Sequence, residues 1–217
     1  MNIERGLYTM KKNTKEALKA ISAHVSEGNM KVGSIPNFSL TPGRTCSKEA
    51  CKTCLREGCY AMKSYRQYKN VKTAWDENSD LAERNLSALE KALSLYFAAE
   101  KPLFFRIHVG GDFVSMAYAE MWARIAEAAP HTRFLAFTKQ WENVRGVKFP
   151  QNFSLVLSGW PETEIPEDLA GQYAQAICVD HAEDMPEGGF LCPGSCESCG
   201  ACWELAKRKV NVYFVKH

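Results

Sequence analysis

Leu103-Phe104-Phe105-Arg106-Ile107-His108-Val109 runs directly into Gly110-Gly111-Asp112. A mostly apolar run, rich in aromatic and β-branched residues, that stops at two glycines is typical of a buried strand followed by a tight turn. Met116–Ala129 then shows apolar residues at helical spacing and stops before Pro130. This order of strand, glycine turn and helix predicts one unit of an α/β fold with parallel strands.

The same alternation extends in both directions from this unit. Downstream, we predict strands at 133–138, 153–158, 176–179 and 210–215, with helices at 142–145 and 203–209. Upstream, we predict a helix over 14–27, a strand over 35–40 and helix over 65–99 with a break inside 76–80. We therefore expect an α/β fold, either an incomplete (β/α) barrel or an open, mostly parallel sheet, with residues 1–217 in a single domain.

Composition narrows the class of protein more than its function. The chain has 217 residues, of which 46% are hydrophobic, and a formal net charge of +2. This charge gives no strong electrostatic sign of a nucleic-acid partner. Because the sequence contains no long apolar run and no apolar stretch behind the charges of residues 1–12, we expect a cytoplasmic protein without a membrane span or a signal peptide.

Nine cysteines require an explanation in a cytoplasmic protein. Eight of them form two groups, which are Cys46, Cys51, Cys54 and Cys59 in the loop 44–60, and Cys192, Cys196, Cys199 and Cys202 in the segment 192–202. Persistent disulfides are rare in the cytoplasm, and the odd number disfavours a fully paired framework, so the groups indicate metal binding. The ninth, Cys178, lies in an apolar stretch, and we expect it to be a small buried core residue.

Spacing within the groups indicates which metal they hold. Cysteines separated by two residues can turn both thiolates onto one ion or one cluster face. Zinc is usually held by two separated cysteine pairs, whereas [4Fe–4S] clusters often take three or four cysteines from one short stretch. The two dense groups therefore favour one or two [4Fe–4S] clusters with all eight grouped cysteines as ligands, and zinc is the alternative.

The loop 44–60 after the first predicted strand, together with Gly110-Gly111-Asp112 after the next, resembles the radical S-adenosylmethionine (SAM) enzymes. In that superfamily, three cysteines on a partial (β/α) barrel hold a [4Fe–4S] cluster that chelates SAM, and a Gly-Gly-Glu-like motif holds the SAM amino group. The resemblance implies a radical-SAM-like fold in which Gly110, Gly111 and Asp112 contact SAM. The first group lacks the usual C-x3-C-x2-C spacing of the superfamily, whereas the second group contains it.

The resemblance also divides the cysteines between two clusters. It implies that Cys46, Cys54 and Cys59 hold the SAM cluster, with Cys51 able to replace Cys46 or Cys54. The second group would then hold an auxiliary cluster. From the residues alone another arrangement stays open, in which the two groups converge in space and share one cluster.

A second resemblance covers about residues 40–205. Cys59-Tyr60-Ala61, Arg106–Phe113, Phe137-Thr138-Lys139, Pro150-Gln151-Asn152 and Cys196–Trp203 are similar in order and spacing to the phage gene product 88 family. That family implies no reaction. One hypothesis is therefore a SAM-dependent or redox enzyme. The rival hypothesis is a non-enzymatic phage or bacterial protein that zinc or an iron–sulfur cluster stabilises and that serves in binding or redox sensing.

Other side chains at strand ends are candidates for ligand binding. Arg106 and His108 are two residues apart in a predicted strand, so we expect both to point to one face, where they could bind a cofactor or substrate anion or bond to each other. Lys139 and Asp180-His181 also follow strands, and each has a plain structural alternative as a solvated or hydrogen-bonded residue.

The stretch 60–75 interleaves aromatic and basic residues. Its members are Tyr60, Tyr65, Tyr68 and Trp75, with Lys63, Arg66, Lys69 and Lys72 between them. Such a stretch can contact nucleic acid by stacking and phosphate pairing, and a helix with one core face and one solvated face explains it equally well.

Overall fold

The computed structural model describes the chain except for residues 1, 30–31, 57, 161–163 and 216–217. Its centre is an open, all-parallel sheet of seven strands in the order β1-β2-β3-β4-β5-β7-β6. The strands are β1 (Asn37–Phe38), β2 (Phe104–Ile107), β3 (Arg133–Thr138), β4 (Phe153–Ser158), β5 (Ala174–Val179), β6 (Phe190–Leu191) and β7 (Val212–Val215). The α/β class and the open parallel sheet are therefore confirmed.

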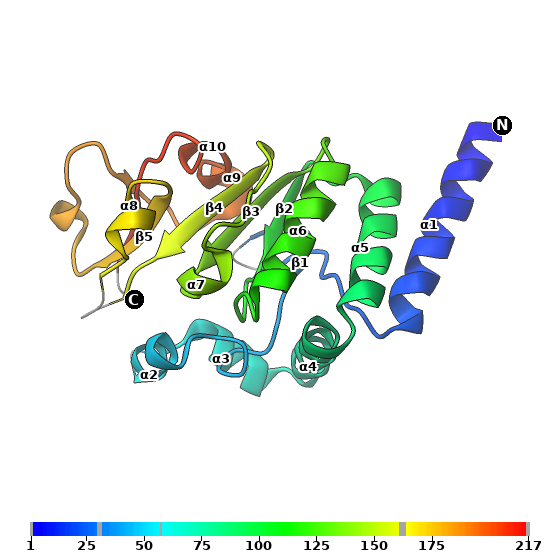
Figure 1. The fold of residues 1–217 in the computed structure, drawn as a ribbon, viewed down its shortest axis with the longest axis horizontal. Helices are drawn as coiled ribbons and strands as arrows, with labels where there is room; N and C mark the ends of the chain where they lie inside the picture. Colours follow the sequence, from blue (N-terminus) through cyan, green and yellow to red (C-terminus); the bar gives the residue numbers. More distant parts are fainter. Residues whose placement is uncertain (1, 30–31, 57, 161–163, 216–217) are drawn as a thin grey trace.

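Helices cover both faces of this sheet (Figure 1). On one face lie α5 (Leu86–Glu100), α6 (Met116–Ala128) and α7 (Trp141–Val144), and α1 (Asn2–Ala20) packs outside α5. On the other face α10 (Cys202–Leu205) packs on β3 and β4, beside α9 (Cys196–Cys199). The short elements α8 (Glu167–Ala170) and η1 (Ala182–Asp184) flank β5.

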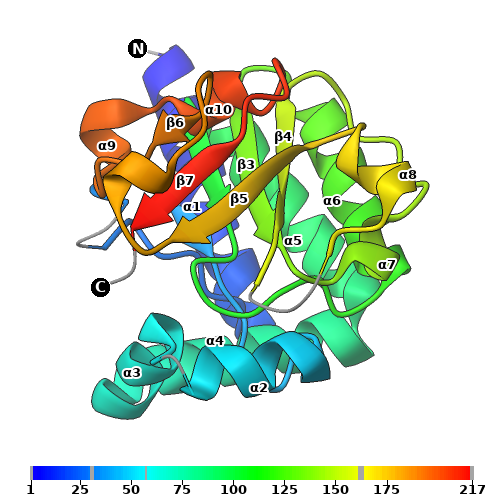
Figure 2. The same cartoon turned by 90° about the vertical axis from the view of Figure 1, so that its left-hand side faces the viewer.

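Three helices form a layer beyond the carboxyl ends of the strands (Figure 2). They are α2 (Lys48–Arg56), α3 (Tyr60–Gln67) and α4 (Lys69–Arg84). The predicted break inside 76–80 is wrong, because those residues lie within α4 and the helical run is interrupted at Tyr68 and Asn85 instead. Tyr68 has extended backbone, and Asn85 has φ −143° and ψ 56°, so neither continues a helix.

The N-terminal helix also differs from its predicted range of 14–27. It starts at Asn2 and ends at Ala20, and Ser22 has a positive φ of 55°. Beyond it, the Asn78 side chain accepts from His24 N–H and donates to His24 C=O, and Ser26 bridges Asn37 antiparallel. These tertiary hydrogen bonds replace the helical ones that local spacing predicted.

The two faces of β2 determine where the core ends and the site begins. Phe105 and Ile107 are fully buried in the large aromatic core under α5 and α6, where Phe97, Trp122 and Phe134 pack edge to face. Phe104 faces the opposite side, in a smaller cluster with Trp203 of α10.

None of the described helices is long and apolar enough to cross a bilayer.

Candidate metal centre

The first cysteine group lies beyond the carboxyl end of β1. Cys46 lies in the loop after β1, Cys51 and Cys54 lie on α2, and Cys59 precedes α3 as its N-cap. Gly43 turns the chain with φ +83°, and a Cβ there would lie 3.2 Å from Met62 and 3.7 Å from the Cys51 sulfur. The glycine thus lets the loop fold closely over α2 and α3.

Electrostatic contacts tie the thiols of this group together. Burial raises the pKa of the Cys46 thiol to about 12, and Cys51 and Cys59 add to the shift. Burial also raises the pKa of Cys54, which Lys139 opposes, while the neighbouring Cys59, Asp112 and Cys178 raise it further. Without a metal the Cys46 and Cys54 thiols therefore stay protonated at neutral pH.

The second group starts at the end of β6. Cys192 N–H donates to Tyr213 C=O, Cys196 and Cys199 lie at the two ends of the one-turn helix α9, and Cys202 opens α10. Burial raises the pKa of Cys202 to about 12, Arg106 lowers it, and Cys192, Cys196 and Cys199 raise it. The four thiols of the second group therefore lie within electrostatic reach of one another.

Tyr60 and Arg106 lie between the two groups. The Tyr60 hydroxyl donates to Val109 C=O at 2.7 Å, although about half of the residue's surface (52%) is exposed. Burial raises the pKa of Tyr60, Arg106 lowers it, and thiols of both groups, Cys59, Cys46 and Cys196, raise it. Tyr60 thus lies within electrostatic reach of cysteines from both groups. The second group itself lies on the sheet face that α9 and α10 cover, where Trp203, next to Cys202, donates to Arg133 C=O at the start of β3 and accepts from the Ser154 hydroxyl.

The thiols approach one another without forming a completed site. Within the described residues, no three Cys, His, Asp or Glu side chains stand close enough together to hold a metal ion. The donor set nevertheless fits a thiolate-bound metal, because each group offers four sulfurs within one short segment. Binding then requires side-chain or loop movement that draws the sulfurs of a group together.

Gly110 and Gly111 have packing roles of their own. A Cβ at Gly110 would lie 2.6 Å from the Trp75 ring, and one at Gly111 would lie 2.6 Å from Leu40 and from Thr45. Gly111 also has φ +79°, a conformation that side chains disfavour. The glycine pair therefore lets α4 and the β1 loop approach the end of β2.

Asp112 joins the ends of three strands. Its carboxylate accepts from Thr138 Oγ1 at 2.6 Å, Lys139 N–H at 2.7 Å and Phe113 N–H at 2.8 Å, and its own N–H donates to Thr45 Oγ1. Burial raises its pKa to about 6, and these hydrogen bonds oppose the shift. Both oxygens of Asp112 are thus already engaged by the protein.

His108 does not lie where the strand pattern predicted. Its φ of +59° breaks the alternation, and its ring packs under α6, with Nε2 3.1 Å from the Tyr118 hydroxyl. Arg106 keeps the strand pattern and lies over the Phe137 ring on the opposite face, with 4.1 Å from its guanidinium carbon to the centroid. The prediction that Arg106 and His108 share a face is therefore wrong, and His108 belongs to the core.

Of the other residues predicted to bind a ligand, some make structural hydrogen bonds and the others are exposed at the surface. Lys139 contributes its backbone N–H to Asp112. His181 is exposed and caps η1 with Asp184, and Asp180 is exposed beside it. Cys178 is exposed, so the prediction of a buried core residue is wrong. Cys178 lies one residue before the end of β5, and it adds to the raised pKa of Cys54.

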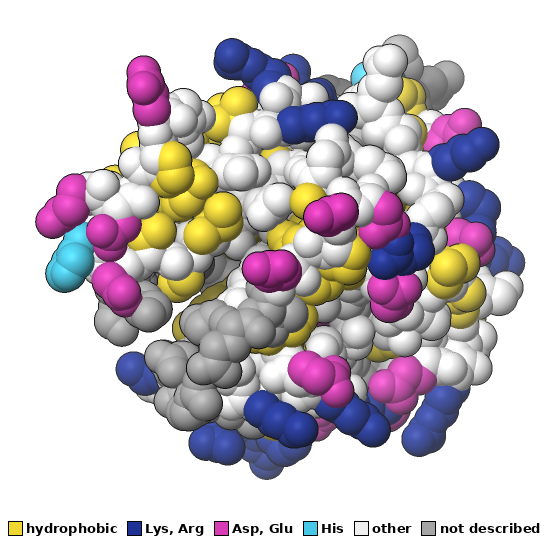
Figure 3. All heavy atoms as spheres, turned by 60° about the vertical axis from the view of Figure 1, so that its left-hand side comes forward, with side chains coloured by type: hydrophobic (Ala, Val, Ile, Leu, Met, Phe, Trp, Pro, Cys, Tyr) yellow, Lys and Arg dark blue, Asp and Glu magenta, His cyan; other side chains and the backbone are white. Residues whose placement is uncertain are grey.

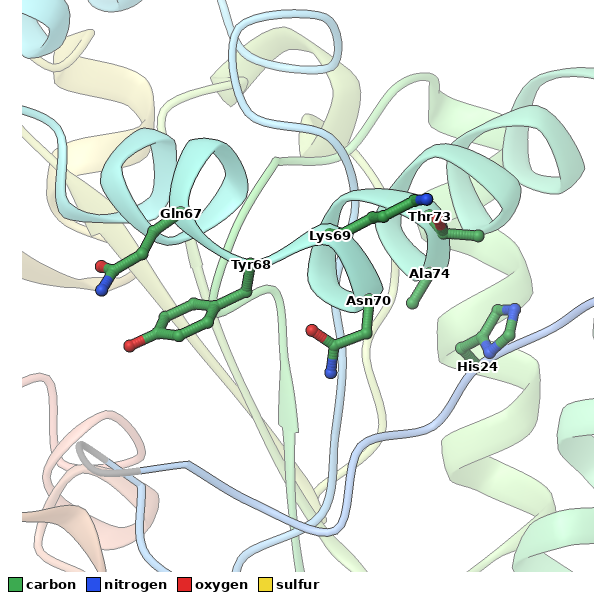
Figure 4. A pocket seen from close by; sticks show the side chains of 7 residues that line it. All are labelled: His24, Gln67, Tyr68, Lys69, Asn70, Thr73 and Ala74. Atoms are coloured by element: carbon green, nitrogen blue, oxygen red, sulfur yellow. The ribbon is translucent and has the colours of Figure 1, made fainter.

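The aromatic and basic stretch is only partly available to a ligand. Tyr65 stacks on Trp75, and its hydroxyl donates to Asp76. Tyr68 is exposed and lines an open hollow of about 720 Å³ with His24, Gln67, Lys69, Asn70, Thr73 and Ala74 (Figure 4). In Figure 3, Lys and Arg side chains gather along the lower edge, where Figures 1 and 2 place α2–α4. This hollow is lined by none of the nine cysteines.

Sequence reasoning did not find Tyr60 as a side chain joining the two groups. Tyr60 follows Cys59 directly, and this adjacency was the one signal for it in the sequence. Thr45 and Thr138, which fix Asp112, were also missed, because a threonine at a strand end is too common to stand out.

Comparison with known proteins identifies a phage family. A family model described as Gene product 88 matches residues 7–209. The "Gene 88 protein" of Mycobacterium phage L5 is 29% identical over 126 residues, which cover 54% of this chain and 53% of that protein. The chain thus aligns with about half the length of this curated relative. No solved structure matches the chain.

Proposed function

The chain belongs to the gene product 88 family, and we propose that it is an iron–sulfur protein whose two cysteine groups hold clusters, the first beyond the carboxyl ends of the strands and the second on the sheet face that α9 and α10 cover. The observation that carries the proposal is the placement of four partly buried cysteines within each of two short segments, residues 46–59 and 192–202. Eight partly buried thiols in two such segments are more than structural packing requires.

The residues that would hold metal are Cys46, Cys51, Cys54 and Cys59 in the first group, and Cys192, Cys196, Cys199 and Cys202 in the second. An iron–sulfur cluster supplies one-electron chemistry when bound. The protein's own contribution is to bury the sulfurs partly and to place Arg106, Tyr60 and Lys139 around them, which sets the local charge. Its cytoplasmic setting, expected from the sequence, would keep the thiols reduced and free to bind metal.

The proposal does not extend to SAM at Gly110-Gly111-Asp112. Both Asp112 oxygens accept hydrogen bonds within the protein, and both glycines are explained by close packing against Trp75, Leu40 and Thr45. The radical-SAM reading of this motif therefore lacks support from the geometry, whereas the cysteine groups retain theirs.

Metal and acid-labile sulfide analysis of anaerobically purified protein tests the proposal. We expect iron and sulfide in similar amounts, and a brown protein absorbing near 400 nm. Replacing two cysteines of one group, C54S/C59S or C196S/C202S, should remove a fraction of the iron and leave the remainder. Colourless protein with stoichiometric zinc and no sulfide would favour the structural zinc protein instead, and protein without either metal would refute both.

A further inference from the structure

The small net charge of the chain conceals a separation of charge along it. Between residues 149 and 206 there are ten Asp or Glu and no Lys or Arg, whereas between residues 48 and 72 seven Lys or Arg stand against two Glu. The acidic segment contains β4, β5, β6 and α8–α10, and the basic segment forms α2, α3 and the start of α4. The formal charge of +2 therefore does not describe the field at any one face, and the α2–α4 layer carries a basic surface.

The basic side chains of this layer are exposed, and several have no counter-charge. The exposed ones are Lys48, Lys52, Lys63, Arg66, Lys69 and Lys72. Lys72 is paired with Asp76, whereas Lys63, Arg66 and Lys69 form no ion pair with any described residue. Figure 3 shows Lys and Arg side chains along the edge where Figures 1 and 2 place this layer. These three cations stabilise no partner within the described chain and are available to a polyanion.

Tyr68 places an aromatic ring among these cations. It interrupts the helical run between α3 and α4 with extended backbone, and about half of its surface (49%) is exposed. Its ring contacts no other ring in the described part of the chain, whereas the nearby Tyr65 stacks on Trp75. Figure 4 shows the Tyr68 ring and the Asn70 side chain on the same side of this junction, where both line the hollow of about 720 Å³ together with Lys69. The hollow therefore offers a free ring face next to a cation.

Charge and shape together favour one class of partner. Unpaired bases stack on exposed aromatic rings while their phosphates follow basic side chains. A lipid surface would need exposed apolar side chains beside the cations, but those of the described chain lie elsewhere, with Leu95 on α5, Leu103 before β2 and Met116 at the start of α6. An acidic protein would match the charge, but it would leave the flat face of Tyr68 unused.

We propose that the α2–α4 layer binds single-stranded nucleic acid, with a base stacked on Tyr68 and phosphates paired with Lys63, Arg66 and Lys69. None of the nine cysteines lines the hollow, so the inference goes beyond the proposed function and does not depend on it. The acidic segment 149–206 would repel the strand elsewhere on the molecule and so direct its approach to this layer.

Fluorescence anisotropy with a labelled oligothymidylate of about 20 nucleotides tests the inference, because such a strand exceeds the usual site of about 4–16 nucleotides. We expect wild-type protein to bind at low salt and Tyr68→Ala to weaken binding about tenfold. Tyr68→Phe keeps the ring and should bind like wild type, whereas Tyr68→Leu keeps only apolar bulk and should lose as much as the alanine variant. K63Q/R66Q/K69Q should reduce the slope of log affinity against log salt by about 2, since each phosphate contact contributes about 0.7.

K91Q/K101Q/K148Q is the matched control, because it removes the same charge from exposed lysines outside the layer and should leave the slope nearly unchanged. Equal affinity of Tyr68→Ala and wild type, or equally tight binding of a duplex of the same length, would overturn the stacking role of Tyr68. Displacement of the oligonucleotide by polyglutamate at equal charge concentration would assign the layer to an acidic protein and overturn the inference.

Binding to vesicles that contain phosphatidylserine, without binding to the oligonucleotide, would assign the layer to a membrane surface and would also overturn the inference. The absence of any oligonucleotide binding at low salt would refute it outright. The iron and sulfide content of the same preparation reports separately on the proposed function, so the failure of one proposal is distinguishable from the failure of the other.

Discussion

Arg106 and His108 lie on opposite faces of the sheet although only Ile107 separates them in the sequence. Arg106 stacks on Phe137 beside the second cysteine group, and His108 meets Tyr118 and Phe113 under α6. The cause is the left-handed backbone of His108, which follows the last residue of β2 with φ +59°. A non-glycine residue in this region costs on the order of 1–2 kcal/mol. This inversion leaves the Arg106 guanidinium on the face of the second cysteine group and buries the neutral His108 imidazole in the core.

Burial of neutral His108 makes the stability of the protein depend on pH. Burial, reinforced by Arg106, lowers its pKa to about 3 from 6.5. The unfolded chain therefore binds a proton that the folded protein does not, and stability is lost as pH falls from about 6.5 toward 3. We expect His108→Asn, which tolerates a positive φ, to lose less stability than wild type between pH 7 and pH 4 in urea titrations.

His131→Asn is the control, since His131 is exposed and its replacement should leave the pH dependence unchanged. Asp112 acts in the opposite sense, because its raised pKa of about 6 makes the folded protein gain stability as pH falls through that value. The difference in pH dependence between wild type and His108→Asn therefore reports on His108 alone. If the free energy of unfolding changed with pH equally in these two proteins, the buried neutral state of His108 would be refuted.

Asp112→Asn should destabilise the junction of β1, β2 and β3. One carboxylate oxygen of Asp112 accepts from Phe113 N–H and Thr138 Oγ1, and the other accepts from Lys139 N–H. An asparagine can replace only one of these oxygens, so its NH₂ group points at a hydrogen-bond donor in either orientation. We expect a loss of about 1–3 kcal/mol in the free energy of unfolding. Asp80→Asn, at an exposed ion pair with Arg44, should cost well under about 1 kcal/mol. Equal costs would show that Asp112 is not a structural junction.

Alanine substitutions at Gly111 and Gly146 distinguish the cost of backbone strain from the cost of steric crowding. Both have positive φ, +79° and +75°, but a Cβ at Gly111 meets Leu40 and Thr45 at 2.6 Å, whereas nothing lies within 4 Å of one at Gly146. Gly146→Ala should therefore cost about 1 kcal/mol through its backbone alone. Gly111→Ala should cost several-fold more or prevent folding, as measured by chemical denaturation. Similar costs at both positions would mean that the β1 loop can move away from β2.

Cys178 should behave differently from the other cysteines toward an alkylating reagent. It is exposed, whereas the eight grouped cysteines are partly buried, and metal binding would protect those eight further. In the metal-loaded protein we expect N-ethylmaleimide to modify Cys178 first, with the grouped cysteines following only after a chelator is added, as read by peptide mass spectrometry. Cys178→Ser should leave the iron content unchanged. A loss of iron in that variant would make Cys178 a ligand.

The sequence by itself determined the α/β class and most of the sheet. β3 and β4 were predicted to the residue and α6 to within one, because buried parallel strands are short apolar runs bounded by turns, a signal that is local. The two-residue strand β6 and the one-turn helices α8 and α9 were missed, since segments of that length carry no periodicity. The prediction of a loop over 44–60 was wrong in part, because α2 (Lys48–Arg56) is a helix within it.

The cysteine groups were also visible in the sequence, because their spacing is local, whereas their meeting at Tyr60 was not. Only the tertiary structure decided which cation faces which group, that Cys178 is exposed, and that His108 turns away from Arg106. These properties depend on packing across the sheet and on one residue's φ, and neither leaves a trace in the pattern of neighbouring residues. The pattern thus specified the strands and the two cysteine groups, and the long-range contacts determined which charged side chains lie near them.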